Sequence, residues 1–212
     1  MTLHALDPAA DLPRRPDRVL VAGGSGAGKT ALAGKLATLL ALPRIELDAL
    51  YYRAGWEPRE EFVEDVGRAC GAPRWITEWH YPEVAQLLAD RADLLVWLDY
   101  PARTTMTSLV LRTLLRSLHQ EVLWSGNREP RLRAVFTDPE HILRYGWSTR
   151  HAAREELRAL ARQSPRLTLD VLRFTRPAEL SRWLLRLTDT SQGPAPSAGT
   201  VTERRSDASG LR

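Results

Sequence analysis

The eight residues from Gly23 to Thr30, GGSGAGKT, constrain the fold of this chain more than any other segment. They match the pattern GxxxxGK[ST], in which a strand leads into a tight loop and the loop leads into a helix. Glycines are needed because the backbone must curl until successive N–H groups point inward, and a Cβ atom would obstruct that curl. The segment therefore predicts a strand, an anion-binding loop and a helix in direct succession.

The residues on either side of the loop have the patterns that this arrangement needs. Residues 18–22 read as a short buried strand, and leucines recur at helical spacing after Thr30. In such a loop, Lys29 would reach the β- and γ-phosphates and Thr30 would place its hydroxyl on Mg²⁺. The motif thus predicts a bound nucleoside triphosphate with magnesium. The residues predicted to hold the phosphates are Gly23, Gly24, Ser25, Gly26, Ala27, Gly28, Lys29 and Thr30.

The kind of cation in the loop supports this interpretation. Lys29 and Lys35 are the only lysines among 30 basic residues, and all the others are arginines. A compact ammonium group suits a phosphate cradle better than a planar guanidinium does. Lys35, further along the helix, is expected to be a solvated helix residue.

Length, charge and cysteine content narrow the class of protein. A chain of 212 residues can bury a real core in one domain, and we expect Cys70 to be a buried, reduced thiol in an apolar helical stripe. No run has the character of a signal peptide or a membrane span, so we expect a cytoplasmic protein. The net charge of +4 suits either nucleic acid or the phosphates of a nucleotide.

The two ends of the chain differ in composition from its middle. Residues 1–17 contain three prolines and predict a flexible arm, whereas residues 188–212 are small and polar and predict a disordered tail. Residues 18–187 alternate strand and helix patterns, which predicts an α/β three-layer sandwich with a parallel sheet and helices on both faces. The five expected strands are residues 18–22, 44–47, 74–77, 94–98 and 166–172.

Acidic residues follow the second, third and fourth of these strands. Asp48, Glu78 and Asp99 stand at the carboxyl ends, the edge of an open α/β sheet where ligands bind. Glu78 and Asp99 are alternatives for a magnesium-associated carboxylate, and we favour Glu78 because Asp99, close to Pro101, also suits a helix cap. Asp48 is predicted either to position or deprotonate an acceptor hydroxyl, or to form a turn.

Aromatic residues gather in the loops after the second and third strands. They suit stacking on a base or sugar and core packing equally well. His80 lacks a partner at metal-ligand spacing and is not predicted to bind metal. The residues concerned are Tyr51, Tyr52, Trp56, Trp79 and Tyr81.

Arginines between residues 103 and 154 predict a lid over the phosphates. Arg112 and Arg116 lie one turn apart on an expected helix, and Arg128 lies in the polar connection beyond it. Arginines on a mobile lid stabilise charge during phosphoryl transfer. The alternative interpretation is a solvated basic face.

Four passages together make residues 18–187 resemble the adenylate-kinase-like P-loop kinases, most closely the group labelled DNA topology modulation proteins. They are GGSGAGKT, LDALYYRAGW at 47–56, LLVWLDYP at 94–101 and LWSGNRE at 123–129. The resemblance implies a sheet in the order 2-3-1-4-5, ATP with Mg²⁺ and an arginine lid. It also implies that Arg176 and Pro177 contact adenine. Where relatives typically read WIIDGNY, this chain has WITEWHY at 75–81.

These observations predict a kinase that moves the γ-phosphoryl group of ATP to a nucleotide, nucleoside or other small hydroxyl acceptor. Lys29 and the arginines Arg112, Arg116 and Arg128 would stabilise charge, and Asp48 would position the acceptor. The alternative is a regulatory NTP-binding or ATPase module that acts on DNA topology or on a protein partner. The sequence has no helix-turn-helix or zinc-finger motif for nucleic acid, and no NKxD string typical of a GTPase.

Overall fold

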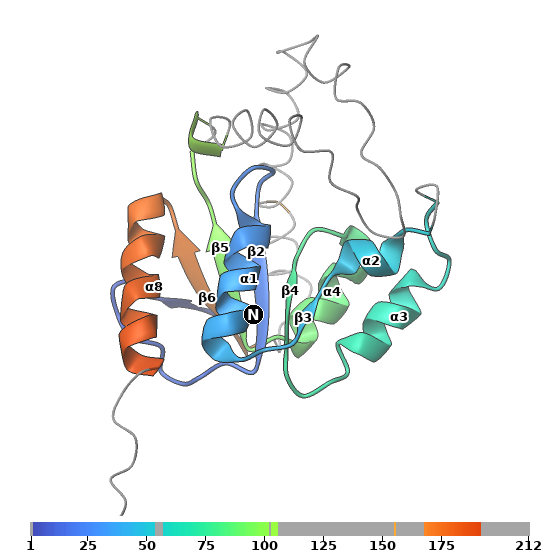
Figure 1. Ribbon diagram of the computed structural model, residues 1–212, viewed down its shortest axis with the longest axis horizontal. Coiled ribbons are helices and arrows are strands. Elements are labelled where there is room, and N and C mark those ends of the chain that lie inside the picture. Colours follow the sequence, from blue (N-terminus) through green and yellow to red (C-terminus); the bar gives the residue numbers. More distant parts are fainter. Residues whose placement is uncertain (1, 54–56, 102, 106–154, 156–167, 192–212) are drawn as a thin grey trace, which may run out of the picture.

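The computed structural model describes residues 2–53, 57–101, 103–105, 155 and 168–191. Over these ranges the chain forms one parallel sheet covered by helices (Figure 1). The predicted α/β architecture is confirmed. The sheet has six strands in the order β1-β6-β5-β2-β4-β3, so the prediction of five strands is wrong. The strands are β1 (Thr2–Leu6), β2 (Arg18–Gly23), β3 (Arg44–Ile45), β4 (Trp75–Glu78), β5 (Leu94–Leu98) and β6 (Thr168–Phe174).

The additional strand comes from residues that the sequence analysis assigns to a flexible arm. β1 pairs in parallel with β6, with Thr2 opposite Thr168 and Leu6 opposite Leu172, so it extends the sheet beyond the segments expected from the sequence. Without β1, the outer N–H and C=O groups of β6 would lack ladder partners. Leu6 and Leu12 also pack against the buried core. Local composition did not reveal this strand because its partner lies 166 positions away in the sequence, as Thr2 opposite Thr168 shows.

The last helix of the described chain extends beyond residue 187, where the sequence analysis placed the end of the folded domain. The last helix, α8, runs from Pro177 to Ser191 and so enters the segment predicted as a disordered tail. The first strong helix-stopping residues, Gly193 and Pro194, come only after that point in the sequence. The other helices are α1 (Lys29–Leu40), α2 (Leu47–Tyr51), α3 (Phe62–Ala69) and α4 (Pro82–Arg91). Among the described residues, none of the helices has both the length and the apolar character needed to cross a membrane.

The sheet divides the core into two buried clusters, and the side chains of β2 alternate between them. Val19 and Val21 belong to a buried cluster with residues of α1 and α8. Leu20 and Ala22 belong to a second buried cluster with residues of α3 and α4. Because successive side chains of a strand point to opposite faces and both faces are covered here, β2 is apolar from Val19 to Ala22. Its carboxyl end is thereby fixed between two layers of helices, and the loop that follows starts from a rigid strand.

Cys70 lies at the end of α3 and is buried, as the sequence predicts. Its carbonyl oxygen accepts a hydrogen bond from Nε1 of Trp75, which is also buried. Burial raises the pKa of the Cys70 thiol to about 11, although the positive charge of Arg91 opposes that shift. Cys70 is therefore a packing residue that is protonated at neutral pH.

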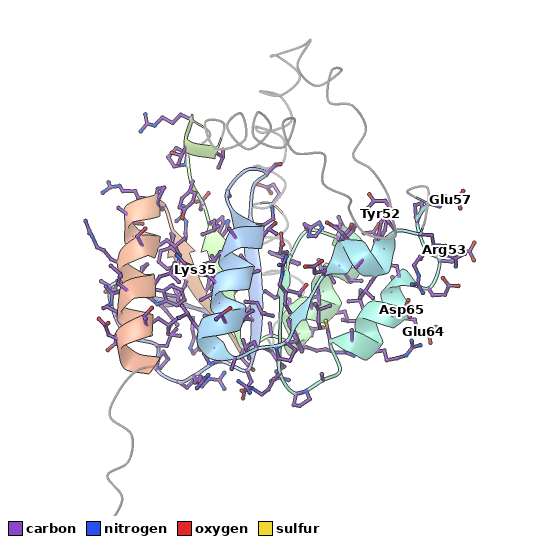
Figure 2. The ribbon with its side chains drawn as sticks, in the orientation of Figure 1. Lys35, Tyr52, Arg53, Glu57, Glu64 and Asp65 are labelled. Atoms are coloured by element: carbon purple, nitrogen blue, oxygen red, sulfur yellow. The ribbon has the colours of Figure 1, made fainter. Side chains whose placement is uncertain are left out.

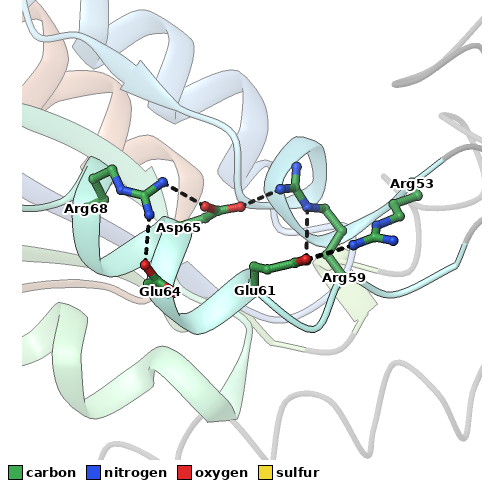
Figure 3. Close-up of polar contacts among 6 residues, drawn as sticks. All are labelled: Arg53, Arg59, Glu61, Glu64, Asp65 and Arg68. Atoms are coloured by element: carbon green, nitrogen blue, oxygen red, sulfur yellow. Dashed lines mark hydrogen bonds and ion pairs between the residues drawn. The ribbon is translucent and has the colours of Figure 1, made fainter.

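A chain of alternating charges ties the segment before α3 to the helix itself (Figure 3). The side chains project from one end of the molecule, where Figure 2 labels Arg53, Glu64 and Asp65. Asp65 is the most buried carboxylate of the set, with its side chain 14% exposed, and it contacts Arg59 at 2.7 Å and Arg68 at 3.1 Å. The contacts join, in order, Arg53, Glu61, Arg59, Asp65, Arg68 and Glu64.

Asp65→Ala is expected to destabilise the protein by about 1–2 kcal/mol, because it leaves two guanidinium groups without their shared carboxylate. Glu64→Ala is the matched control: Glu64 is 75% exposed and contacts Arg68 alone among these arginines, so its loss is expected to change stability by less than about 0.5 kcal/mol. Urea unfolding of the two variants measures the difference. Equal losses for both variants would show that Asp65 does not organise the chain of charges.

Candidate functional site

The loop between β2 and α1 has the backbone that the glycine-rich motif predicts. Gly26 and Gly28 have φ angles of 76° and 92°, which side chains rarely tolerate. At Gly23, a Cβ atom would lie 2.9 Å from the carbonyl oxygen of Leu98 on β5. Gly28 precedes α1 without a side-chain capping hydrogen bond, and the first turn contains no acidic residue. The N–H groups at the start of α1 are therefore suited to an anion.

Lys29, the first residue of α1, lies over this loop. Its Nζ donates hydrogen bonds to the carbonyl oxygens of Gly23 at 3.0 Å and Gly24 at 3.3 Å. The same ammonium group is close enough to Asp48 to help lower the pKa of that carboxyl group. Lys29 thus lies on the glycine-rich loop and contributes a small part of the charge that acts on Asp48, the residue predicted to position an acceptor.

Glu78 meets the loop through Thr30. The Thr30 hydroxyl donates to Oε2 of Glu78 at 3.2 Å, and Arg44 Nη2 donates to Oε1 at 3.4 Å. Arg44 also contacts Glu46 at 3.3 Å. The contact between Thr30 and Glu78 follows from the sheet, because β4 lies beside β2 with Glu78 opposite Val21. Glu78 is therefore the carboxylate in contact with the motif's hydroxyl group.

Asp99, the alternative carboxylate, has different partners. It is buried at the end of β5, and its Oδ2 accepts hydrogen bonds from Nε and Nη2 of Arg173 at 2.9 and 2.5 Å. Arg173 lies on β6, with its guanidinium 4.9 Å from the ring centroid of Trp97. The Asp99 carboxylate is thus bound by a neighbouring strand, whereas Glu78 contacts Thr30.

Asp48 lies in the first turn of α2, where side chains from the end of β4 surround it. Its Oδ1 accepts a hydrogen bond from the Tyr81 hydroxyl at 2.6 Å and lies 3.0 Å from Nε2 of His80. Burial alone would raise the pKa of Asp48. Hydrogen bonds with His80 and Tyr81, together with the charge of Lys29, outweigh burial and hold that pKa below its ordinary value. Asp48 is therefore ionised at neutral pH.

The aromatic residues near Asp48 pack mainly against one another and the core. Tyr81 has its ring centroid 4.6 Å from that of Tyr51 and 4.9 Å from that of Phe62. Trp79 is buried in the core that includes α3 and α4. Of the two interpretations left open by the sequence, packing describes Tyr51, Trp79 and Tyr81. Trp56 lies outside the described residues.

The sequence analysis did not predict the polar contacts that Arg44, His80 and Tyr81 make with the carboxylates of the predicted site. Their polar partners could not be read from local patterns, since Asp48 is 32 and 33 positions away from His80 and Tyr81. One signal was available. His80 and Tyr81 follow the third expected strand directly, at the edge where Glu78 was already placed.

The remaining predicted site residues either lie outside the described residues or are exposed away from the loop contacts given above. Arg112, Arg116 and Arg128 lie outside the described residues, as does nearly all of the expected lid. Arg176 and Pro177 are exposed at the start of α8, where the Arg176 N–H donates to Oε2 of Glu179 at 3.1 Å. In Figure 1, α8 lies beside α1, the helix that follows the glycine-rich loop.

Among the comparisons with known proteins, only the comparison with solved structures found similar proteins. No family model matches the chain, and no curated protein is significantly similar to it. A gluconokinase from Sinorhizobium meliloti 1021 is 17% identical, with a TM-score of 0.43, covering 84% of this chain and 96% of its own. A shikimate kinase from Bacteroides thetaiotaomicron is 15% identical, with a TM-score of 0.44, covering 82% of this chain and 98% of its own.

A shikimate kinase from Acinetobacter baumannii, in complex with shikimate, is also similar in structure. It is 12% identical, with a TM-score of 0.48, covering 84% of this chain and 96% of its own. These identities and TM-scores are low. The fold and the candidate site of this chain therefore rest on its own topology, backbone angles and contacts.

Proposed function

We propose that this chain is a P-loop kinase that transfers the γ-phosphoryl group of ATP to a small hydroxyl acceptor. The observation that carries the proposal is the glycine-rich loop with two side chains in place: Nζ of Lys29 lies on the loop, and the Thr30 hydroxyl contacts Glu78 at 3.2 Å. Asp48, an ionised carboxylate on a different helix, is the candidate for orienting an acceptor. A site for phosphoryl transfer needs both a phosphate cradle and a group that orients the attacking oxygen.

The loop and the start of α1 would bind the phosphates through backbone N–H groups. Lys29 would exchange its carbonyl partners on Gly23 and Gly24 for oxygens of the β- and γ-phosphates. Thr30 and Glu78 have the hard oxygen atoms that Mg²⁺ prefers, and they already lie 3.2 Å apart. We therefore assign the magnesium-associated role to Thr30 and Glu78, with Glu78 acting through water.

Bound magnesium would neutralise charge on the β- and γ-phosphate oxygens. In the transfer, the acceptor oxygen forms a bond to γ-phosphorus while the bond from γ-phosphorus to the β–γ bridging oxygen breaks. ADP leaves with that electron pair. Asp48 orients the acceptor hydroxyl and takes up its proton, which then passes to water.

Two finer assignments belong to this proposal. Arg112, Arg116 and Arg128 would contribute positive charge from a lid, and Arg176 and Pro177 would contact adenine. We also propose membership of the DNA topology modulation group, supported by the four passages that include the glycine-rich loop and the end of β5. The rival function is NTP-dependent regulation of DNA or of a protein partner, and the net charge of +4 is compatible with it.

A paired experiment tests the proposal. Transfer of labelled γ-phosphate from ATP is measured with Mg²⁺ across nucleosides, nucleotides, sugars and small alcohols, and DNA binding is titrated at several salt concentrations. Transfer that depends on one class of acceptor supports the kinase function. DNA binding without any acceptor-dependent transfer would contradict it and favour the regulatory function.

A further inference from the structure

The two oxygens of the Asp48 carboxylate are engaged differently. Oδ1 has two partners, the hydroxyl of Tyr81 at 2.6 Å and Nε2 of His80 at 3.0 Å. Within the part of the chain that the structure describes, no side chain or backbone group donates a hydrogen bond to Oδ2. The side chain of Asp48 is 33% exposed, so that a small molecule can reach it. One oxygen is thus held by the protein, and the other is available to a ligand.

The Tyr81 hydroxyl is the more firmly held of the two donors. Tyr81 immediately precedes α4, and its ring packs against Tyr51 of α2 and Phe62 of α3. Phe62 is only 3% exposed. Three helices therefore fix the ring that carries the hydroxyl group. A hydrogen bond of 2.6 Å to an ionised carboxylate belongs to the strong, charge-assisted class.

His80 is the second donor and the more exposed one. An ionised carboxylate only accepts hydrogen bonds, so Nε2 of His80 must carry the proton that it shares with Asp48. The side chain of His80 is 32% exposed, and its ring centroid lies 4.2 Å from that of Tyr81. Water can replace His80 more easily than it can replace the hydroxyl group of a packed tyrosine.

We propose that Tyr81 is a positioning residue for phosphoryl transfer: its hydroxyl holds Oδ1 of Asp48 so that Oδ2 faces the acceptor hydroxyl. This inference rests on the proposed kinase function and adds a residue to it. Tyr81 touches neither ATP nor the acceptor and acts through Asp48. The acceptor it implies is a molecule that donates an O–H group to a fixed carboxylate oxygen.

The test uses Tyr81→Phe in the full chain, because this change removes one oxygen atom and keeps the packed ring. We expect kcat to fall by about 10- to 100-fold, since a carboxylate that rotates away misaligns the acceptor. The affinity for MgATP, measured by calorimetry, should stay unchanged. Tyr100→Phe is the matched control, because the Tyr100 hydroxyl is buried without a hydrogen-bond partner among the described residues. It should retain wild-type kcat.

A second measurement reports the pKa of Asp48 itself. Carboxyl-carbon NMR titration should show a higher pKa for Asp48 in Tyr81→Phe than in the wild type, because a hydrogen bond to the charged form has been lost. Among the described residues, the titratable or charged groups that act on Asp48 are His80, Tyr81 and Lys29. A Tyr81 side chain that only packed its ring, without donating a hydrogen bond to Asp48, would leave this pKa unchanged.

The outcomes separate the two proposals. Wild-type transfer with an unchanged kcat in Tyr81→Phe would overturn the positioning role alone, as would an unchanged pKa of Asp48. Absence of transfer by the wild type with every acceptor would overturn the kinase function and the positioning role together.

Discussion

Replacing Lys29 with alanine is expected to lower the rate of phosphoryl transfer by about 10²- to 10³-fold, the usual effect of removing one preorganised donor from a transition state. Lys29 supplies the positive charge at the glycine-rich loop, where its Nζ already lies within hydrogen-bond distance of Gly23 and Gly24. The measurement is steady-state transfer of labelled γ-phosphate to the best acceptor, together with calorimetry of ATP binding. We expect both transfer and affinity to fall.

Lys35→Ala provides a closely matched control. Lys35 is the only other lysine in the chain, and it is exposed on the same helix (Figure 2). The two variants remove the same charge from the same helix, so they differ mainly in the contact with the loop. A wild-type rate of transfer in Lys29→Ala, or an equal loss of rate in both variants, would contradict a specific role for Lys29.

Gly23→Ala is expected to lower the free energy of unfolding by about 1–3 kcal/mol, as overpacking in a tight structure does. The new Cβ atom would meet the Leu98 carbonyl oxygen at 2.9 Å and the Ala27 Cβ atom at 3.3 Å. Gly23 pairs with Leu98 across β2 and β5, so the backbone itself would have to move. Urea unfolding measures the loss of stability, and calorimetry should show weaker ATP binding because the loop starts at Gly23.

Gly34→Ala is the control for that change. In the middle of α1, the added Cβ atom would find its nearest neighbour, Nη1 of Arg44, at 3.9 Å. Alanine costs less backbone entropy than glycine in a helix, so the variant should be as stable as the wild type or more stable by about 0.5–1 kcal/mol. Comparable destabilisation in both variants would show that the contact with Leu98 is not the cause.

The parts that the sequence predicts best are those whose signals are local. The strand at residues 18–23, the glycine-rich loop and α1 follow one another as a continuous motif, and the strand is apolar from Val19 to Ala22. The placement of Asp48 shortly after β3 and of Glu78 at the end of β4 follows from the parallel pairing of these strands. These features need no knowledge of distant residues.

The parts that the sequence does not predict depend on distant partners. β1 needs β6, which lies at the other end of the described chain, and the three prolines after it dominate local composition. The Asp99 carboxylate pairs with Arg173, 74 positions away, and nothing near Asp99 indicates that partner. Tyr81 fits both a base-stacking and a packing pattern, and only the surrounding rings of Tyr51 and Phe62 distinguish them.

The two carbonyl contacts of Lys29 have a consequence for affinity. A solvent-exposed lysine loses rotational freedom when it captures a ligand, and immobilising such a side chain costs about 0.5–1.5 kcal/mol. Here the loop itself already restrains the ammonium group before any triphosphate arrives. Much of that entropic cost would therefore be incurred during folding, and a triphosphate bound as proposed would meet a cation that is already restrained beside the loop.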